Sequence, residues 1–193
     1  MWTNNIDEIR RCLGSLSVSD SNSNDINPDK AFEVLTNWTF RIKEQRNKLF
    51  LIGNGASASM ASHVAADLAK NGHIHTEVFT DLSLITAIAN DISFEDVFAE
   101  PLKRRLVQGD MLVAISSSGK SPNILNAVKT TKQLNAKVVT LSAMDEKNPL
   151  RNIGDLNFYV PAYTYGMAET CHAALLHYWI DMVVKMHEIT AED

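Results

Sequence analysis

An apolar run that ends in a loop of small hydroxyl residues limits the folds open to this chain more than any other feature. Residues 111–115 are all apolar, and Ser116 leads through residues 117–121 (Ser-Ser-Gly-Lys-Ser) into Pro122. A strand that is apolar on both faces is typical of a parallel sheet covered by helices on both sides. Serine followed by proline is a common start of a helix. The junction therefore predicts a strand, a short loop and a helix in succession.

The loop itself has the composition of an anion-binding site. Free N–H groups and the positive end of the helix dipole attract anions to a helix N-terminus. Four hydroxyls add further donors without bulk, those of Ser116, Ser117, Ser118 and Ser121. The pattern G-x-x-x-x-G-K-[ST] is absent, so the phosphate of a small metabolite fits better than that of ATP. A plain helix cap at Ser121 explains the same residues on local grounds.

Strand-like and helix-like segments alternate through the rest of the chain. Short buried strands are expected at residues 49–52, 76–79, 111–116, 137–142 and 156–160. Helices are expected at residues 57–71, 84–90, 94–106, 122–134 and 168–187. This alternation predicts a three-layer α/β/α sandwich around a five-stranded parallel sheet. Two further helices precede the first strand, at residues 1–16 and 28–47, with a polar loop at residues 17–29 before the second.

A second loop follows the first expected strand and opens the next helix. Its sequence is Gly53-Asn54-Gly55-Ala56-Ser57, in which the glycines permit close backbone approach and Asn54 and Ser57 offer polar side chains. In parallel sheets, ligands lie beyond the carboxyl ends of the strands, where this loop and the serine loop converge. Two such loops together predict a phosphorylated ligand.

Two helices carry residues that suit metal binding or proton transfer. His63 and Asp67 are four residues apart and so share one helix face. That spacing suits two ligands of one divalent ion or a carboxylate that orients an imidazole, and a surface ion pair gives the same pattern. On the terminal helix, Glu169 and His177 are eight residues apart and diverge by about 80° in direction. His172, one turn from Glu169, is the competing candidate.

Composition removes several classes of function. A chain of 193 residues fits one domain, and a net charge of −5 gives no reason to expect a nucleic-acid partner. No apolar run approaches the length of a membrane span, so no membrane association is expected. Cys12 and Cys171 are far apart and form no metal or redox motif. Together with the lack of a signal peptide, this predicts a reducing, cytoplasmic location.

The motifs together resemble those of the SIS (sugar isomerase) domain family and, within it, the phosphoheptose isomerases. The resemblance runs from residue 51 to residue 187. It is carried, in order, by Gly53-Asn54-Gly55-x-Ser57, by His63 with Asp67, by Thr86-Ala87-Ile88-Ala89-Asn90-Asp91, by Gly109-Asp110, by Ile115-Ser116-Ser117-Ser118-Gly119-x-Ser121, and by Glu169, His172 and His177. The SIS fold that it implies has a flavodoxin-like parallel sheet.

The resemblance implies an aldose–ketose isomerase of heptose biosynthesis. Sedoheptulose 7-phosphate would become D-glycero-D-manno-heptose 7-phosphate through an enediol, with Asp67 as the base and His177 as its acid partner. One zinc ion per subunit would be bound by His63, Asp67, Glu169 and His177. The sugar and its phosphate would be bound by Asn54, Gly55, Ser57, Asn90, Asp91, Ser116, Ser117, Ser118, Ser121 and Glu169.

The resemblance also implies a homotetramer with active sites between subunits. On this basis residues 1–47 are an N-terminal helical oligomerisation segment, and residues 48–193 are the phosphosugar-binding SIS domain. Packing of that segment on its own domain is the alternative.

Departures from the family pattern fall at the site rather than in the core. Asp67 stands where the family has Glu, Glu169 where it has Gln, and Asn71 where an Arg is usual. Residues 165–168 (Tyr-Gly-Met-Ala) lack the usual Asp-Arg pair. Two alternatives therefore stay open: an isomerase or sensor for another sugar phosphate, and a non-catalytic SIS protein that binds the DnaA replication initiator. Two histidines and two acids at the expected positions favour the enzyme.

Overall fold

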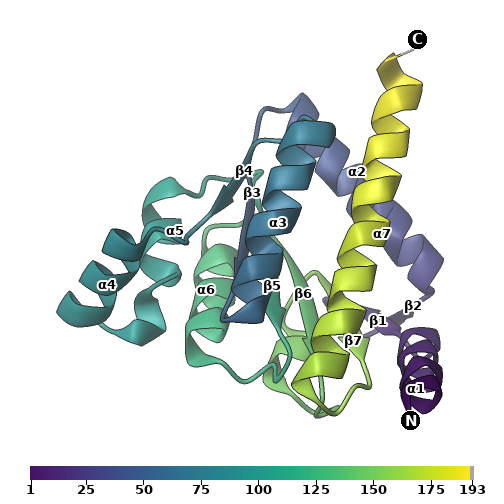
Figure 1. Cartoon of the computed structure of the whole chain (residues 1–193). Helices are drawn as coiled ribbons and strands as arrows, with labels where there is room; N and C mark the ends of the chain where they lie inside the picture. The colour runs from purple at the N-terminus through teal and green to yellow at the C-terminus, as the bar shows by residue number, and fades with distance from the viewer. Residues whose placement is uncertain (192–193) are drawn as a thin grey trace.

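The computed structural model describes residues 1–191, and a single mixed sheet forms its centre (Figure 1). The strand order is β2-β1-β7-β6-β5-β3-β4. The strands are β1 (Ser17–Asp20), β2 (Asp25–Ile26), β3 (Leu49–Gly53), β4 (Thr76–Val78), β5 (Met111–Ser116), β6 (Lys137–Ala143) and β7 (Leu156–Val160). The five strands from β7 to β4 are parallel, whereas β1 and β2 are antiparallel and lie at one edge.

The expected five-stranded sheet is therefore wrong in strand number, because the sheet has seven strands. The expected loop at residues 17–29 contains both additional strands. Val18 is buried, and its strand pairs with β7 in the register Val18↔Phe158. The few apolar residues of this segment give no local strand signal. It becomes a strand because β7 offers an unpaired edge, which only the tertiary structure supplies.

Helices cover both faces of the sheet and confirm the three-layer sandwich (Figure 1). They are α1 (Trp2–Gly14), α2 (Pro28–Glu44), α3 (Ala56–Asn71), α4 (Leu82–Asp91), α5 (Ala99–Arg105), α6 (Pro122–Gln133) and α7 (Tyr165–Ala191), with 3-10 turns η1 (Phe94–Asp96) and η2 (Pro149–Asn152). Strand side chains alternate between two cores. Val113 packs with α2, α3 and α7, whereas its neighbour Leu112 packs with α5 and α6.

The expected single helix at residues 94–106 is wrong. The segment forms η1 and then α5, which begins at Ala99. Pro101 accounts for the break, because proline inside a continuous helix would lose the bond to the carbonyl of Val97 and clash with it. In the first turn of α5 the missing N–H carries no such penalty.

The N-terminal helices belong to the main core. α2 buries its apolar face on the sheet, with Phe32 and Leu35 almost fully covered. The indole of Trp179 on α7 donates a hydrogen bond to the hydroxyl of Thr39 on α2, at 3.2 Å. α2 is therefore packed on its own domain, and one side of it remains available to a partner. Among the described residues, no helix is long and apolar enough to cross a membrane.

Candidate functional site

The serine loop and the glycine loop meet at the carboxyl end of the sheet. β3 and β5 are neighbours with the register Gly53↔Ile115, so the loops that follow them lie side by side. They enclose a cavity of about 140 Å³. Its walls are formed by Asn54, Ser57, Ile115, Ser116, Ser117, Ser118, Ser121, Tyr165 and Glu169. The structure thus brings together most of the side chains expected to bind the phosphosugar.

Ser121 does not act as a plain helix cap. It precedes α6, but its side chain makes no capping hydrogen bond to the first turn of that helix. Its hydroxyl instead lies 3.3 Å from the hydroxyl of Ser116. The two hydroxyls face each other across the loop beside the N-terminus of α6. This arrangement favours the anion site over the cap, because hydroxyl donors and the helix dipole then act at one place.

The serine loop packs against the buried side-chain amide of Asn148. Gly119 has φ +62, and its carbonyl accepts a hydrogen bond from the N–H of Leu150 at 3.2 Å. The side chain of Asn148 is buried against this glycine and donates to the carbonyl of Asp145 at 2.8 Å. Lys120 forms an ion pair with the Asp145 carboxylate at 2.7 Å. These contacts fix the loop without using the hydroxyls that face the cavity.

We expect replacement of Ser118 by alanine to weaken phosphate binding. The KM for a sugar phosphate should rise about tenfold, because a hydrogen bond to a charged group contributes about 1.5–3 kcal/mol. Inorganic phosphate should also protect the variant less against thermal unfolding. Ser15→Ala is the matched control, since Ser15 is exposed at the end of α1. Equal protection of Ser118→Ala and the wild-type protein would contradict the assignment.

A second group of side chains lies where α3 packs against α7. Candidate ligand atoms of His63, Asp67 and His177 all lie within 4.8 Å of one another. The Nε2 atoms of the two histidines are 3.2 Å apart, and the His63 Nε2 is 3.3 Å from an Asp67 carboxylate oxygen. Ligands of a tetrahedral zinc ion are separated by about 3.3 Å when the bonds are about 2.0 Å long. These two separations match the ligand spacing of one such ion, and the ligand atoms of His177 and Asp67 are within 4.8 Å of each other.

The main chain fixes the tautomer of one histidine. The His177 Nδ1 lies 2.9 Å from the carbonyl oxygen of Ala173, which can only accept a hydrogen bond. Nδ1 therefore donates to this carbonyl, and Nε2 is the nitrogen that faces His63. A ligating imidazole is commonly oriented in this way by a hydrogen bond to its other nitrogen.

Glu169 and His172 of α7 do not belong to this group. α7 is a regular helix from Tyr165, so Glu169 and His177 are separated by about 12 Å along its axis. Glu169 lies in the wall of the serine cavity, and its role as a metal ligand stays a prediction. His172 is fully buried, and neither ring nitrogen has a hydrogen-bond partner. Burial lowers its pKa to about 4, so this imidazole is neutral and belongs to the core.

Asn90 and Asp91 lie away from the cavity of their own chain. Both are exposed at the end of α4, where the Asn90 amide donates to the Asp91 carboxylate at 2.8 Å. Neither contributes to the cavity wall described above. Their contact with substrate stays a prediction.

Three residues near the cavity were not predicted from the sequence as part of the site. Asn148 supports the serine loop, Tyr165 lines the cavity, and Asn123 forms hydrogen bonds with Asn54. The hydrogen-bond partners of Asn148 and Asn123 are residues whose positions are fixed only when the chain folds. Tyr165 was visible only as part of an atypical segment before Glu169.

Comparison with known proteins agrees with this geometry. The pattern of the SIS domain matches residues 27–143, and the chain belongs to the SIS domain family. A phosphoheptose isomerase of Helicobacter pylori is 34% identical over 148 residues, which cover 74% of this chain and 77% of the relative.

Two solved structures are similar as well. The phosphoheptose isomerase from Neisseria gonorrhoeae has a TM-score of 0.74 and 28% identity, and the match covers 80% of this chain and 86% of that one. The enzyme from Francisella tularensis has a TM-score of 0.74 and 25% identity, with 81% and 86% covered.

Proposed function

We propose that the protein is an aldose–ketose isomerase that converts sedoheptulose 7-phosphate to D-glycero-D-manno-heptose 7-phosphate. The observation that carries this proposal is the group of His63, Asp67 and His177 between α3 and α7, together with a serine-lined cavity to which α7 also contributes Glu169. Similarity to phosphoheptose isomerases identifies the reaction class that such a site performs. The activity places the protein in heptose biosynthesis, and its two free thiols fit a reducing cytoplasm.

The reaction needs one carbon-bound proton to move between adjacent carbons. Asp67 removes a proton from C1 of the ketose and returns it to C2, and the hydroxyl proton moves from the C1 oxygen to the C2 oxygen. His177 is the acid partner for this second transfer when its Nε2 is not bound to a metal ion. Ser116, Ser118 and Ser121 hold the phosphate, so binding energy from a remote group positions the reacting carbons. His63, Asp67 and His177 would hold a zinc ion, with Glu169 as the proposed fourth ligand. A zinc ion bound there would supply positive charge near the substrate oxygen that becomes anionic.

The predicted homotetramer accounts for two features of the isolated chain. α4 is among the most apolar helices, yet none of its residues is buried. Leu82 at its start and Ile92 just after its end are 73% and 56% exposed. A neighbouring subunit that covers α4 would bring Asn90 and Asp91 toward a second active site. This is the arrangement proposed for substrate contacts across the interface.

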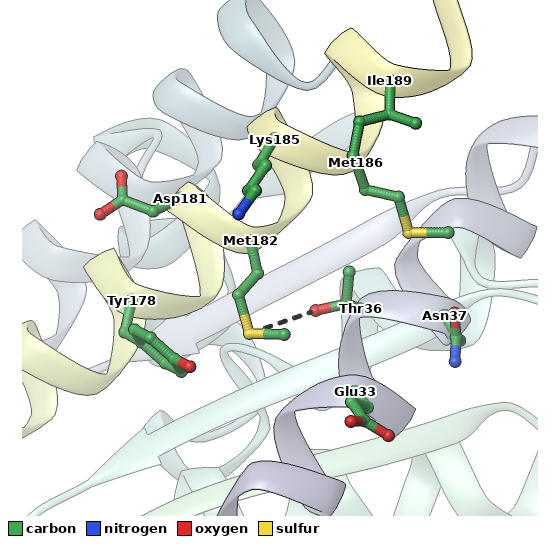
Figure 2. Close-up of a pocket in the computed structure, with 9 residues that line it drawn as sticks. All are labelled: Glu33, Thr36, Asn37, Tyr178, Asp181, Met182, Lys185, Met186 and Ile189. Atoms are coloured by element: carbon green, nitrogen blue, oxygen red, sulfur yellow. Dashed lines mark hydrogen bonds between the residues drawn. The ribbon is translucent and has the colours of Figure 1, made fainter.

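A groove between α2 and α7 is the second surface proposed for the tetramer (Figure 2). It encloses about 510 Å³, and Figure 2 shows side chains from both helices along it, with the Thr36 hydroxyl bonded to the Met182 sulfur. Tyr178 and Ile189 are 48% and 57% exposed in it. Its lining combines apolar side chains with the acidic Glu33 and Asp181 and the basic Lys185, so a second copy related by a two-fold axis can pair with the same surface.

We expect Ile189→Glu to reduce the size of the assembly. An exposed carboxylate in the groove would be desolvated by a second copy, and it costs the isolated chain little. Light scattering of the wild-type protein should give four times the 21.4 kDa of one chain, and the variant should give less. Val107→Glu is the control, because Val107 is 59% exposed and lies in neither surface. A monomeric wild-type protein at micromolar concentration would refute the tetramer.

Metal analysis and a substrate panel test the function directly. The purified protein should contain one zinc ion per chain and should isomerise sedoheptulose 7-phosphate faster than C5 and C6 ketose phosphates. Preference for a shorter ketose phosphate would shift the assignment to another sugar. Absence of both metal and turnover would favour the non-catalytic alternative.

A further inference from the structure

Two asparagine side chains form a reciprocal pair at the candidate site. The Asn54 Nδ2 donates to the Asn123 Oδ1 at 2.9 Å, and the Asn123 Nδ2 donates to the Asn54 Oδ1 at the same distance. Such a ring of two hydrogen bonds requires both an amide donor and an amide acceptor from each partner. An ionised aspartate or a serine in place of either asparagine cannot form this ring of two hydrogen bonds.

The pair joins the two loops that build the cavity. Asn54 lies in the glycine loop just before α3, and Asn123 is the second residue of α6, directly after the serine loop. Asn123 is only 2% exposed, and its carbonyl oxygen also accepts a hydrogen bond from the N–H of Ile124 at 3.0 Å. Burial and these hydrogen bonds together hold the Asn123 side chain in one conformation.

Asn54 faces the cavity, whereas Asn123 lies outside the cavity wall and bonds to Asn54. Asn54 lines the cavity, and Asn123 is not among the described residues that form its wall. Each amide has two donor hydrogens and two acceptor lone pairs, and the pair uses one of each on Asn54. The other hydrogen and lone pair of Asn54 stay free for a ligand, in an orientation that Asn123 sets.

We propose that Asn123 is a positioning residue for substrate binding, acting through Asn54. It fixes the orientation of the Asn54 amide and the distance between the N-termini of α3 and α6, whose partial positive charges converge on the cavity. This inference rests on the proposed function only for the identity of the substrate. The anion-binding geometry that it describes is independent of the reaction.

A double-mutant cycle tests the proposal. Asn123→Ala should raise the KM for the sugar phosphate about tenfold and change kcat less than threefold, because both hydrogen bonds that orient the Asn54 amide are lost. The same substitution in an Asn54→Ala background should raise KM less than twofold, since the pair is already broken. Inorganic phosphate should raise the melting temperature of Asn123→Ala by less than half as much as that of the wild-type protein.

Asn126→Ala is the matched control. Asn126 lies on the same helix, and its amide bonds to the carbonyl of Glu95 and the carboxylate of Asp96, away from the cavity. This variant should lose some stability yet keep the KM and the phosphate-induced shift. If Asn123→Ala does not fold, Asn123→Asp retains the shape and the acceptor, lacks the donor to Asn54, and should show the same loss of phosphate protection.

The outcomes separate this proposal from the proposed function. A folded Asn123 variant with unchanged KM and unchanged phosphate protection would overturn the positioning role. Equal fold-changes of Asn123→Ala in the wild-type and Asn54→Ala backgrounds would overturn it as well. A wild-type protein that isomerises no sugar phosphate refutes the function alone, and the phosphate-induced shift then still measures the pair.

Discussion

Replacement of His177 by alanine should remove both the metal and the activity of this protein. Its Nε2 lies 3.2 Å from the Nε2 of His63, and its Nδ1 is held by the carbonyl of Ala173. Loss of one imidazole leaves too few strong donors to retain a zinc ion, and it removes the acid partner of Asp67. We expect kcat to fall by at least about a thousandfold. Zinc content should fall well below one per chain.

His75→Ala provides the control for that measurement. His75 is also exposed and is four residues beyond the end of α3, yet it is not part of the metal-ligating group. The control should keep zinc and turnover. Stoichiometric zinc that persists in a double variant of His63→Ala and His177→Ala would show that the ion is bound elsewhere.

The strands at the centre of the fold were predictable because burial on two faces leaves a continuous apolar run. Residues 49–52, 111–116, 137–142 and 156–160 all became strands of the parallel sheet. The edge strands β1 and β2 were not predictable, because their segment has only isolated apolar residues such as Val18 and Ile26. These strands form because β1 pairs with β7, which lies far from β1 in the sequence.

The site was predictable to the extent that it depends on strand–loop–helix junctions. The serines and Glu169 share one cavity, as expected, because adjacent parallel strands end at the same edge. The contact between His63 and His177 needs the packing of α3 on α7, which helical spacing alone cannot provide. The family resemblance supplied that contact, and it did not reveal the amide pair of Asn54 and Asn123.

Replacement of Gly119 by alanine should damage both stability and phosphate binding. At φ +62 an alanine is strained by about 1–2 kcal/mol. Its Cβ would also collide with the buried amide of Asn148 and disturb the bond from that amide to the carbonyl of Asp145. Disrupting that amide costs about 1–3 kcal/mol more, so we expect the free energy of unfolding to fall by about 2–5 kcal/mol. The KM for the sugar phosphate should rise at least tenfold.

Gly14→Ala is the comparison that isolates the cause, because a Cβ at Gly14 meets no atom within 4 Å. That variant should be as stable as the wild-type protein or slightly more so, since alanine favours the helix more than glycine does. Chemical denaturation of both variants gives the difference in stability, and thermal shifts with inorganic phosphate give the difference in binding. Were Gly119→Ala to keep full phosphate protection, phosphate binding would not depend on the loop conformation that Gly119 and Asn148 impose.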